Sequence, residues 1–139
     1  MIEAHGGSNV MIRMLDGESL VDGLLSVGLE SAIILGGIGM VRDATLAYWN
    51  GSEYEEHVVE EPAELLAMQG TIGRMDGKPI AHCHLTVARR DGSVTGGHLV
   101  SATVANTAEV ALKRLQGIVL ERKVEASGLA GLQPRCTAD

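Results

Sequence analysis

Three histidines in the sequence have the residue type and spacing of a metal site. His82 and His84 stand on either side of Cys83, and His98 follows a pair of glycines further along the chain. In a β-strand, residues two positions apart point to the same face, so His82 and His84 share a face and Cys83 points away from it. Imidazole nitrogens are ligands for zinc and for other divalent transition metals. These residues therefore predict a metal centre, provided that the fold brings His98 to the same face.

The place of His98 depends on the turn that the Asp91-Gly92 dipeptide makes. Dipeptides of this type commonly join the two strands of a hairpin. A turn of only these two residues pairs Arg90 with Ser93, and the register then places His98 opposite Leu85. In that register His98 lies on the wrong face, and the three histidines do not meet.

A loop of three residues, with its glycine in the left-handed conformation, gives a different register. It pairs Arg89 with Ser93 and places His98 directly opposite His84, with His82 diagonal to the pair. The three imidazoles then converge as the ligand set of an open tetrahedral site, with Zn²⁺ as the first candidate and another divalent transition metal as the alternative. The competing interpretation is that each histidine only fills space or bonds to a carbonyl.

The residues around this motif limit what it could do. Gly96 and Gly97 leave room beside His98 for a ligand or for another strand. An open metal site can activate water, but no general base lies within the motif, so catalysis does not follow. Cys83 is expected to be a small buried side chain rather than a nucleophile. The glycine-rich segment 36–39 lacks the following helix of a dinucleotide loop, so it predicts a tight bend or a close strand crossing.

The composition describes one acidic domain with an aliphatic core. The 139 residues include 18 acidic and 11 basic side chains, for a net charge of −7, and 45% are hydrophobic but only 2% aromatic. This length suits a single domain. The negative charge argues against general nucleic-acid binding, which needs clustered basic residues. We expect no membrane span, no signal peptide and no disulfide framework, and therefore a cytoplasmic protein.

The expected elements form a mainly antiparallel sheet with one clear helix, or two. A helix should follow Ser19, which is suited to cap it. Strands are expected at residues 11–15, 31–35, 45–49, 55–59, 65–70, 80–87, 94–104 and 118–124, with hairpin turns at 50–51, 76–77 and 91–92. Segment 109–115 fits either a strand or a helix. This order predicts the α+β class, with a domain at 10–132 and flexible ends at 1–9 and 133–139.

Motifs spread over most of the chain occur together in one known family. They are Gly36-Gly37-Ile38-Gly39, Glu64-Leu65-Leu66, Gly77-Lys78-Pro79, the His82 and His84 pair, Asp91-Gly92, Gly96-Gly97-His98-Leu99 and Glu109. Together they resemble the PPC domain, also called PCC or DUF296. That domain is found beside AT-hooks in plant DNA-binding proteins and alone in bacteria and archaea, and this chain resembles the stand-alone type from about Val10 to Leu132.

The resemblance implies a fold, an assembly and a site. The fold would be a mixed, largely antiparallel β-sheet with one main α-helix, in which segment 109–115 is a strand, and the chain would form a homotrimer. The metal ligands, near a subunit boundary, would be His82, His84 and His98. The candidate ligand-binding residues are Gly96, Gly97, Glu64 and Glu109, of which the two glutamates are also the candidate acid or base. The ligand expected there is a small anion.

DNA binding is associated with the family, but the sequence departs from the plant pattern. It has no Arg-Gly-Arg-Pro AT-hook, the element that grips the minor groove. Segment 61–66 keeps only two identities, Glu64 and Leu66, with the stretch that plant members use for partner contact. We therefore predict a trimeric binding module with a metal or small-ligand site. The alternatives are DNA binding, direct or through a partner, and a metal-dependent enzyme of unknown substrate.

Overall fold

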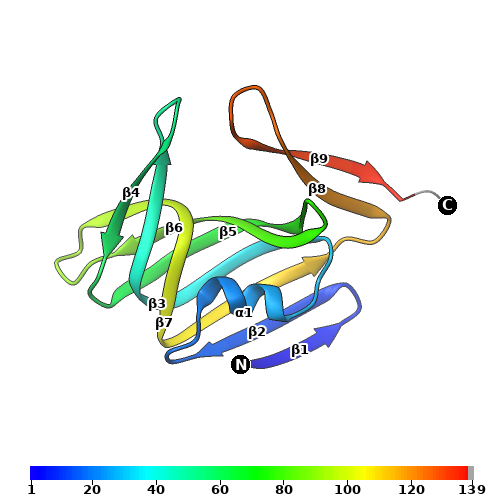
Figure 1. Cartoon of the computed structure of the whole chain (residues 1–139). Coiled ribbons are helices and arrows are strands. Elements are labelled where there is room, and N and C mark those ends of the chain that lie inside the picture. Colours follow the sequence, from blue (N-terminus) through cyan, green and yellow to red (C-terminus); the bar gives the residue numbers. More distant parts are fainter. Residues whose placement is uncertain (138–139) are drawn as a thin grey trace.

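The computed structural model of the chain describes residues 1–137, which form nine strands and one helix (Figure 1). The strands are β1 (Ile2–Gly6), β2 (Asn9–Leu15), β3 (Ala32–Trp49), β4 (Tyr54–Val59), β5 (Ala63–Met75), β6 (Lys78–Ala88), β7 (Val94–Arg114), β8 (Ile118–Val124) and β9 (Ala130–Cys136), and the helix is α1 (Leu20–Ser26). Every pair of strands is antiparallel except β5 with β8, which confirms the mixed, largely antiparallel sheet. No helix within residues 1–137 is long and apolar enough to cross a membrane.

Four strands close into a ring, and this ring positions the histidines. β3 pairs with both β5 and β7, and β6 pairs with the same two strands. The sheet continues from the ring through β2 and β1 on one side and through β8 and β9 on the other. Figure 1 shows the β3–β4 and β8–β9 hairpins extending beyond the ring, while α1 lies over β2 and β7.

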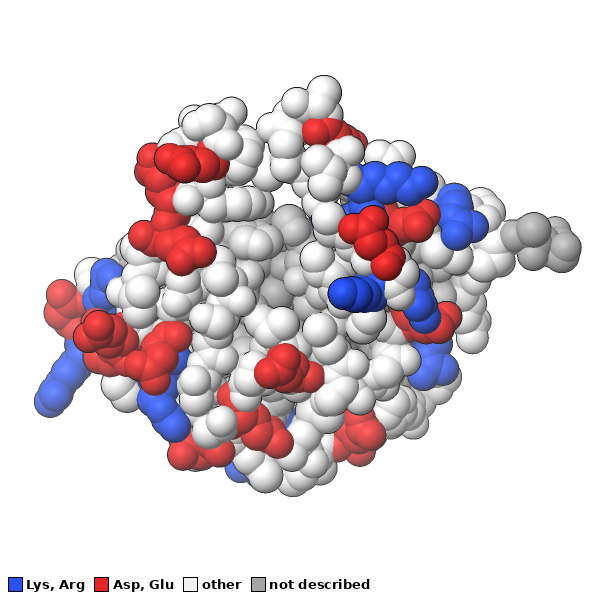
Figure 2. All heavy atoms as spheres, viewed as in Figure 1, with Lys and Arg blue, Asp and Glu red and all other residues white. Residues whose placement is uncertain are grey.

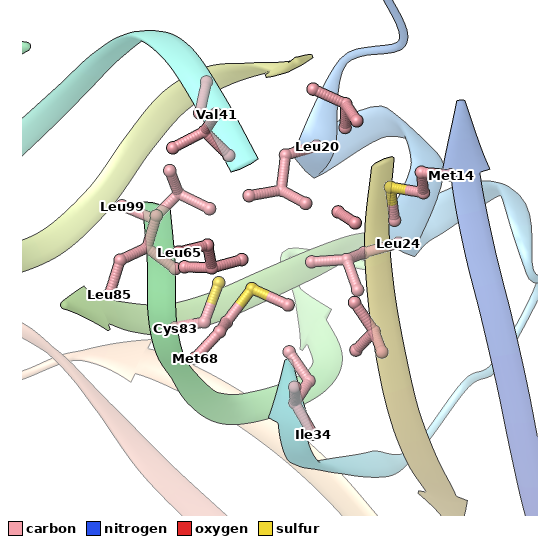
Figure 3. Close-up of a cluster of buried hydrophobic side chains, with 14 of the residues drawn as sticks. Met14, Leu20, Leu24, Ile34, Val41, Leu65, Met68, Cys83, Leu85 and Leu99 are labelled. Carbon is pink, nitrogen blue, oxygen red and sulfur yellow. The ribbon is translucent and has the colours of Figure 1, made fainter. Parts of the chain in front are cut away.

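The core is aliphatic and lies between this ring and α1. Ser19 caps the helix, as predicted, by accepting a hydrogen bond from the backbone N–H of Asp22 at 3.3 Å. Leu20 and Leu24 are fully buried, and Figure 3 shows them among side chains from β2, β3, β5, β6 and β7. No aromatic side chain of the described residues belongs to this core. Burial of its apolar side chains is the main source of stability.

The glycine-rich segment 36–39 lies within β3 and precedes more strand rather than a helix. The register of β3 against β7 shifts on both sides of this segment, so the strand is bulged there. Gly39 has a φ of +142°, and a Cβ at this position would collide with the carbonyl oxygen of Thr107 on β7. The predicted close strand crossing is confirmed, and a dinucleotide loop is absent from this segment.

Several strands are longer than the sequence predicted. Residues 31–35 and 45–49 are parts of the single strand β3, apart from the buried Ser31 just before it. Residues 94–104 and 109–115 lie almost entirely in β7, so the ambiguous segment is a strand, as the family resemblance implied. The bulges explain the difference, because a strand can bend at them without ending.

Strands extend into both ends of the chain, for which the sequence predicts flexibility. Within residues 1–9, β1 pairs with β2 over five residue pairs. Within residues 133–139, the first four residues pair with β8 as part of β9, and residues 138–139 lie outside the described part of the chain. All five residues of β1 are exposed. This short edge strand lies in a polar, glycine-rich stretch, and such a composition is also typical of a flexible end.

Candidate metal centre

The β6–β7 hairpin has the three-residue loop that brings the histidines together. The backbone N–H of Arg89 donates to the Ser93 carbonyl at 2.8 Å, and the N–H of Gly92 donates to the Arg89 carbonyl at 2.9 Å. Gly92 has a φ of +83°, the left-handed conformation that the loop requires. The resulting register places His84 directly opposite His98. Of the two registers that the sequence leaves open, the structure has the one given by the three-residue loop.

The three imidazole rings face one another. Their centres are 5.4 Å apart for His82 and His84, 4.8 Å for His82 and His98, and 5.6 Å for His84 and His98. One nitrogen from each ring lies within 4.8 Å of the other two. Two imidazole nitrogens on a tetrahedral zinc ion lie roughly 3.3 Å apart, because each Zn–N bond is about 2.0–2.1 Å. Small side-chain rotations would close this difference and leave a fourth position open.

The surroundings of the cluster favour neutral imidazoles. The pKa of His82 is lowered from 6.5 to about 4, first by burial and then by the charges of Arg122, His98 and His84. Burial also lowers the pKa of His98, with a further contribution from the charges of His84 and Arg122. Only the neutral ring offers a lone pair to a metal. These two side chains are therefore ready to bind a metal at neutral pH.

His98 carries a further sign of a missing partner. Its Nδ1 atom is buried and has no hydrogen-bond partner among the described residues. Buried polar atoms are nearly always satisfied, so an unsatisfied one needs an explanation. The His98 ring also stacks on that of Tyr54, whose centre is 5.1 Å away. A metal ion or a bound ligand would satisfy this nitrogen.

The glycines beside His98 let three strands approach closely. A Cβ at Gly97 would lie 2.8 Å from the carbonyl oxygen of Ala47 on β3, and a Cβ at Gly96 would lie 2.5 Å from that of Leu85 on β6. Any side chain at these positions would push β7 away from its neighbours. Gly97 also lines the cavity over the histidines. Gly96 thus keeps the strand that carries His98 close to β6, and Gly97 keeps it close to β3.

A cavity of about 690 Å³ opens over the histidines. Figure 2 shows the molecule hollowed between the β3–β4 and β8–β9 hairpins. Tyr48, Trp49 and Tyr54, which are all the aromatic residues of the sequence, line this cavity together with Arg122 of β8. The ring of Trp49 meets that of Tyr54 edge-on at 5.2 Å between centres. The site therefore combines imidazole, aromatic and guanidinium groups.

Sequence reasoning missed Arg122 and the part played by the aromatic residues. Arg122 reaches the cavity because β8 pairs in parallel with the end of β5, where Arg122 lies opposite Met75. Local sequence carries no signal for such a distant pairing. The aromatic residues did carry a sequence signal, because all of them fall within positions 48–54 and the rest of the chain has none.

The structure does not bring the two candidate glutamates to the histidines. Glu64 is exposed on β5 and borders a separate depression that Met40 and Arg89 also line. Glu109 is exposed on β7 beside Leu35. Neither lines the cavity over the metal cluster. The other acidic side chains between residues 53 and 61 are also exposed.

Comparison with solved structures relates this fold to archaeal and bacterial proteins. A PPC protein from Pyrococcus horikoshii superimposes with a TM-score of 0.85 at 31% identity, over 95% of this chain and 94% of that one. A metal-containing protein from Archaeoglobus fulgidus gives 0.82 at 31% identity, over 96% and 99%. A candidate DNA-binding protein from Bacteroides thetaiotaomicron gives 0.87 over 95% and 96% of the two chains, but at 24% identity this likeness shows the fold alone.

Sequence comparison agrees with this likeness. Bifunctional GlmU proteins from two Synechococcus strains are 31% identical to the chain over 106 residues, which is 73% of this chain but only 16% of their own length. The sequence model of the Plants and Prokaryotes Conserved (PCC) domain matches residues 1–116. It therefore covers the helix, both histidine motifs and every strand up to β7. The chain belongs to the PCC domain family.

Proposed function

We propose that this protein is a binding module in which His82, His84 and His98 hold a divalent transition metal, with Zn²⁺ as the first candidate. The observation that carries the proposal is the convergence of these imidazoles, with the buried Nδ1 of His98 lacking a partner among the described residues. The donor set supports zinc, since three neutral imidazoles with one open position form a common zinc site. The metal-containing protein from Archaeoglobus fulgidus, 31% identical to the chain, adds support.

The open position of this metal would take a small anionic ligand. A metal ion is the largest local charge in such a site and attracts anions directly. Binding is better supported than catalysis, because no Asp or Glu of the described residues lines the cavity to act as a general base. The alternative of a metal-dependent enzyme would need a base supplied by the ligand or by another subunit.

Metal analysis of protein purified without a polyhistidine tag tests the proposal. After incubation with zinc and removal of free ions, we expect about one equivalent per chain for the unaltered protein and for His5→Ala, because His5 is exposed and lies outside the cluster. The His84→Ala variant should lose most of this zinc. Less than about a tenth of an equivalent on the unaltered protein, or equal binding by His84→Ala, would contradict the metal site.

We also propose that the chain assembles as a homotrimer. In support, one face of the sheet exposes large apolar side chains that a monomer would leave in water. Met11, Ile33, Leu35 and Ile38 are 48%, 37%, 49% and 58% exposed. Contiguous apolar surface of this kind is typical of an interaction site. Light scattering at micromolar concentration should give three times the chain mass of 14.6 kDa, and a monomer mass would contradict the proposal.

A further inference from the structure

The cavity over the histidines differs in charge from the rest of the molecule. The sequence carries 18 acidic residues and a net charge of −7, yet no Asp or Glu within residues 1–137 lines this cavity, whereas Arg122 does. A cleft that is lined by charge of one sign concentrates ions of the opposite sign, so a recess with a basic but no acidic side chain stands out in an acidic protein. It would admit an anion and not repel it.

The guanidinium of Arg122 is held in place by neutral groups. Its Nη1 donates to the carbonyl oxygen of Ala130 at 2.9 Å, and its Nη2 donates to Oγ1 of Thr71 at 3.2 Å. No ion pair forms between Arg122 and a carboxylate of the described residues. A guanidinium has five N–H groups, so donors remain free after these two bonds. The charge of Arg122 is thus positioned but not neutralised.

The apolar side of the cavity is made of rings. The ring of Tyr54 stacks on that of His98 and meets that of Trp49 edge-on, with ring centres 5.1 Å and 5.2 Å away. A Cβ at Gly128, in the turn between β8 and β9, would lie 3.7 Å from the ring of Trp49, so this ring reaches the opposite hairpin. Aromatic side chains favour stacked or edge-on contact with another ring. The chain concentrates all its aromatic side chains at this one place.

We propose that the cavity binds a small carboxylate that carries a planar aromatic ring, with the carboxylate paired to Arg122 and the ring packed against Tyr54 and Trp49. This inference rests on the proposed function of the chain as a binding module. The proposed metal would supply a second anchor for a donor atom of the same ligand, but the contacts with Arg122 and the aromatic rings do not depend on it. A planar guanidinium matches a carboxylate through two parallel hydrogen bonds. The cavity volume of about 690 Å³ lies within the range of sites for molecules of this size.

Other ligand classes fit these groups less well. A nucleotide or another polyphosphate would bring several negative charges, but Arg122 is the only Lys or Arg among the described residues that line the cavity. An uncharged apolar molecule would bury the free N–H groups of Arg122 without partners, which is costly. A small carboxylate without a ring would leave the faces of Tyr54 and Trp49 unused.

Isothermal titration calorimetry of the zinc-loaded protein tests this inference with three probes. Benzoate has both features, benzamide replaces the carboxylate by a neutral amide of the same shape, and acetate lacks the ring. We expect benzoate to bind at least about tenfold more tightly than either of the others, since a charged hydrogen bond and a ring contact each contribute this order of affinity. Because Trp49 is the single tryptophan of the chain, benzoate should also change its fluorescence.

Two variants locate the carboxylate. Arg122→Gln should weaken benzoate binding about tenfold or more while zinc stoichiometry stays unchanged, and Arg135→Gln, an exposed position on the same hairpin, should bind benzoate normally. Benzoate binding no tighter than that of benzamide or acetate would overturn the inference without any variant. Unchanged affinity in Arg122→Gln would also overturn it. If benzoate binds through Arg122 but zinc does not bind, the metal proposal fails and this inference stands.

Discussion

The two faces of strand β6 have different roles, because one packs in the hydrophobic core and the other lines the candidate metal site. On one face, Cys83 and Leu85 are 1% and 2% exposed and point into the aliphatic core (Figure 3). On the other face, His82 and His84 point into the cavity with the aromatic side chains and Arg122. Burial raises the pKa of the Cys83 thiol to about 12, so this cysteine stays protonated and inert. Alternate side chains of this one strand thus either pack in the core or line the cavity.

This arrangement explains why the cluster can be polar without weakening the fold. Apolar burial is supplied by α1 and by the inner faces of the ring strands, where no polar group needs a partner. The cavity face can then leave a nitrogen of His98 and the charge of Arg122 available to a ligand. Substitutions on the two faces should therefore separate folding from binding.

The largest expected effect is on the core face. Leu85→Ala removes a fully buried side chain and should lower the free energy of unfolding by about 2–5 kcal/mol. His84→Ala, at the neighbouring position on the cavity face, should change the stability of the metal-free protein by less than about 0.5 kcal/mol. Urea unfolding at one fixed protein concentration compares the two. Equal losses would mean that the faces of β6 are not independent.

Metal binding should add stability through the cavity face alone. Zinc at a hundred times its dissociation constant is expected to raise the free energy of unfolding by about 2.7 kcal/mol, because it binds the folded state only. His82→Ala should lose most of this gain, whereas His5→Ala should keep it. Unfolding with and without zinc measures both variants, and an equal gain in His82→Ala would place the zinc elsewhere.

A substitution on the neighbouring strand β5 should affect both the stability of the fold and the binding of zinc. A Cβ at Gly70 of β5 would lie 2.6 Å from Cα of Cys83 and would collide with the carbonyl oxygen of His82. Gly70→Ala should therefore cost about 1–3 kcal/mol of stability and also weaken zinc binding, because it displaces the strand that holds His82. Gly36→Ala is the matched control, since no atom lies within 4 Å of a Cβ there. The same stability for both variants would refute the close approach.

The stability should also depend on pH, and this dependence should come from the cavity face. The folded-state pKa of His82 is about 4, below the 6.5 of an ordinary histidine, so the unfolded chain binds more protons between these values. The stability of the metal-free protein should therefore be fully present above about pH 6.5 and should fall as the pH drops towards 4. The lowered pKa of His98 acts in the same direction.

The His82→Gln variant checks the source of this dependence. It cannot titrate, so the curve of unfolding free energy against pH should become flatter in this window, with a chelator present throughout. His5→Gln serves as the control and should keep the original slope. A slope that is the same in all three proteins would show that the cavity histidines are not desolvated.

The smallest expected effect concerns DNA. The net charge of −7 and the sparse basic residues around the cavity give phosphates little to bind. We expect no retardation of duplex DNA by micromolar protein in a gel-shift assay at low salt. A clear shift that weakens with salt would contradict this expectation and would favour the alternative of DNA binding.

The histidine cluster could be predicted because its geometry depends on short-range rules. The spacing of His82 and His84 fixes their common face, and the loop around Gly92 fixes the register of His98. The choice between two possible loops needed the structure, since the Asp91-Gly92 dipeptide suits both. The family resemblance resolved the strand at 109–115 in the same way, by adding information that the local pattern lacked.

The rest of the site could not be predicted because it depends on distant contacts. Arg122 joins the cavity only through the short parallel pairing of β8 with β5. Glu64 and Glu109 were named from family positions, and the structure places both on other surfaces. The segments at the two ends are rich in polar residues with Gly or Pro, so their composition resembles that of a flexible tail although strands form there.

Anomalous diffraction from crystals grown with zinc tests the central claim most directly. Data collected at the zinc absorption edge should show one strong peak per chain, about 2.0–2.1 Å from a nitrogen of each of His82, His84 and His98. The same map would show whether the fourth position is open to a ligand in the cavity below Trp49 and Tyr54. A peak at another site, or no peak between these three imidazoles at saturating zinc, would contradict the account.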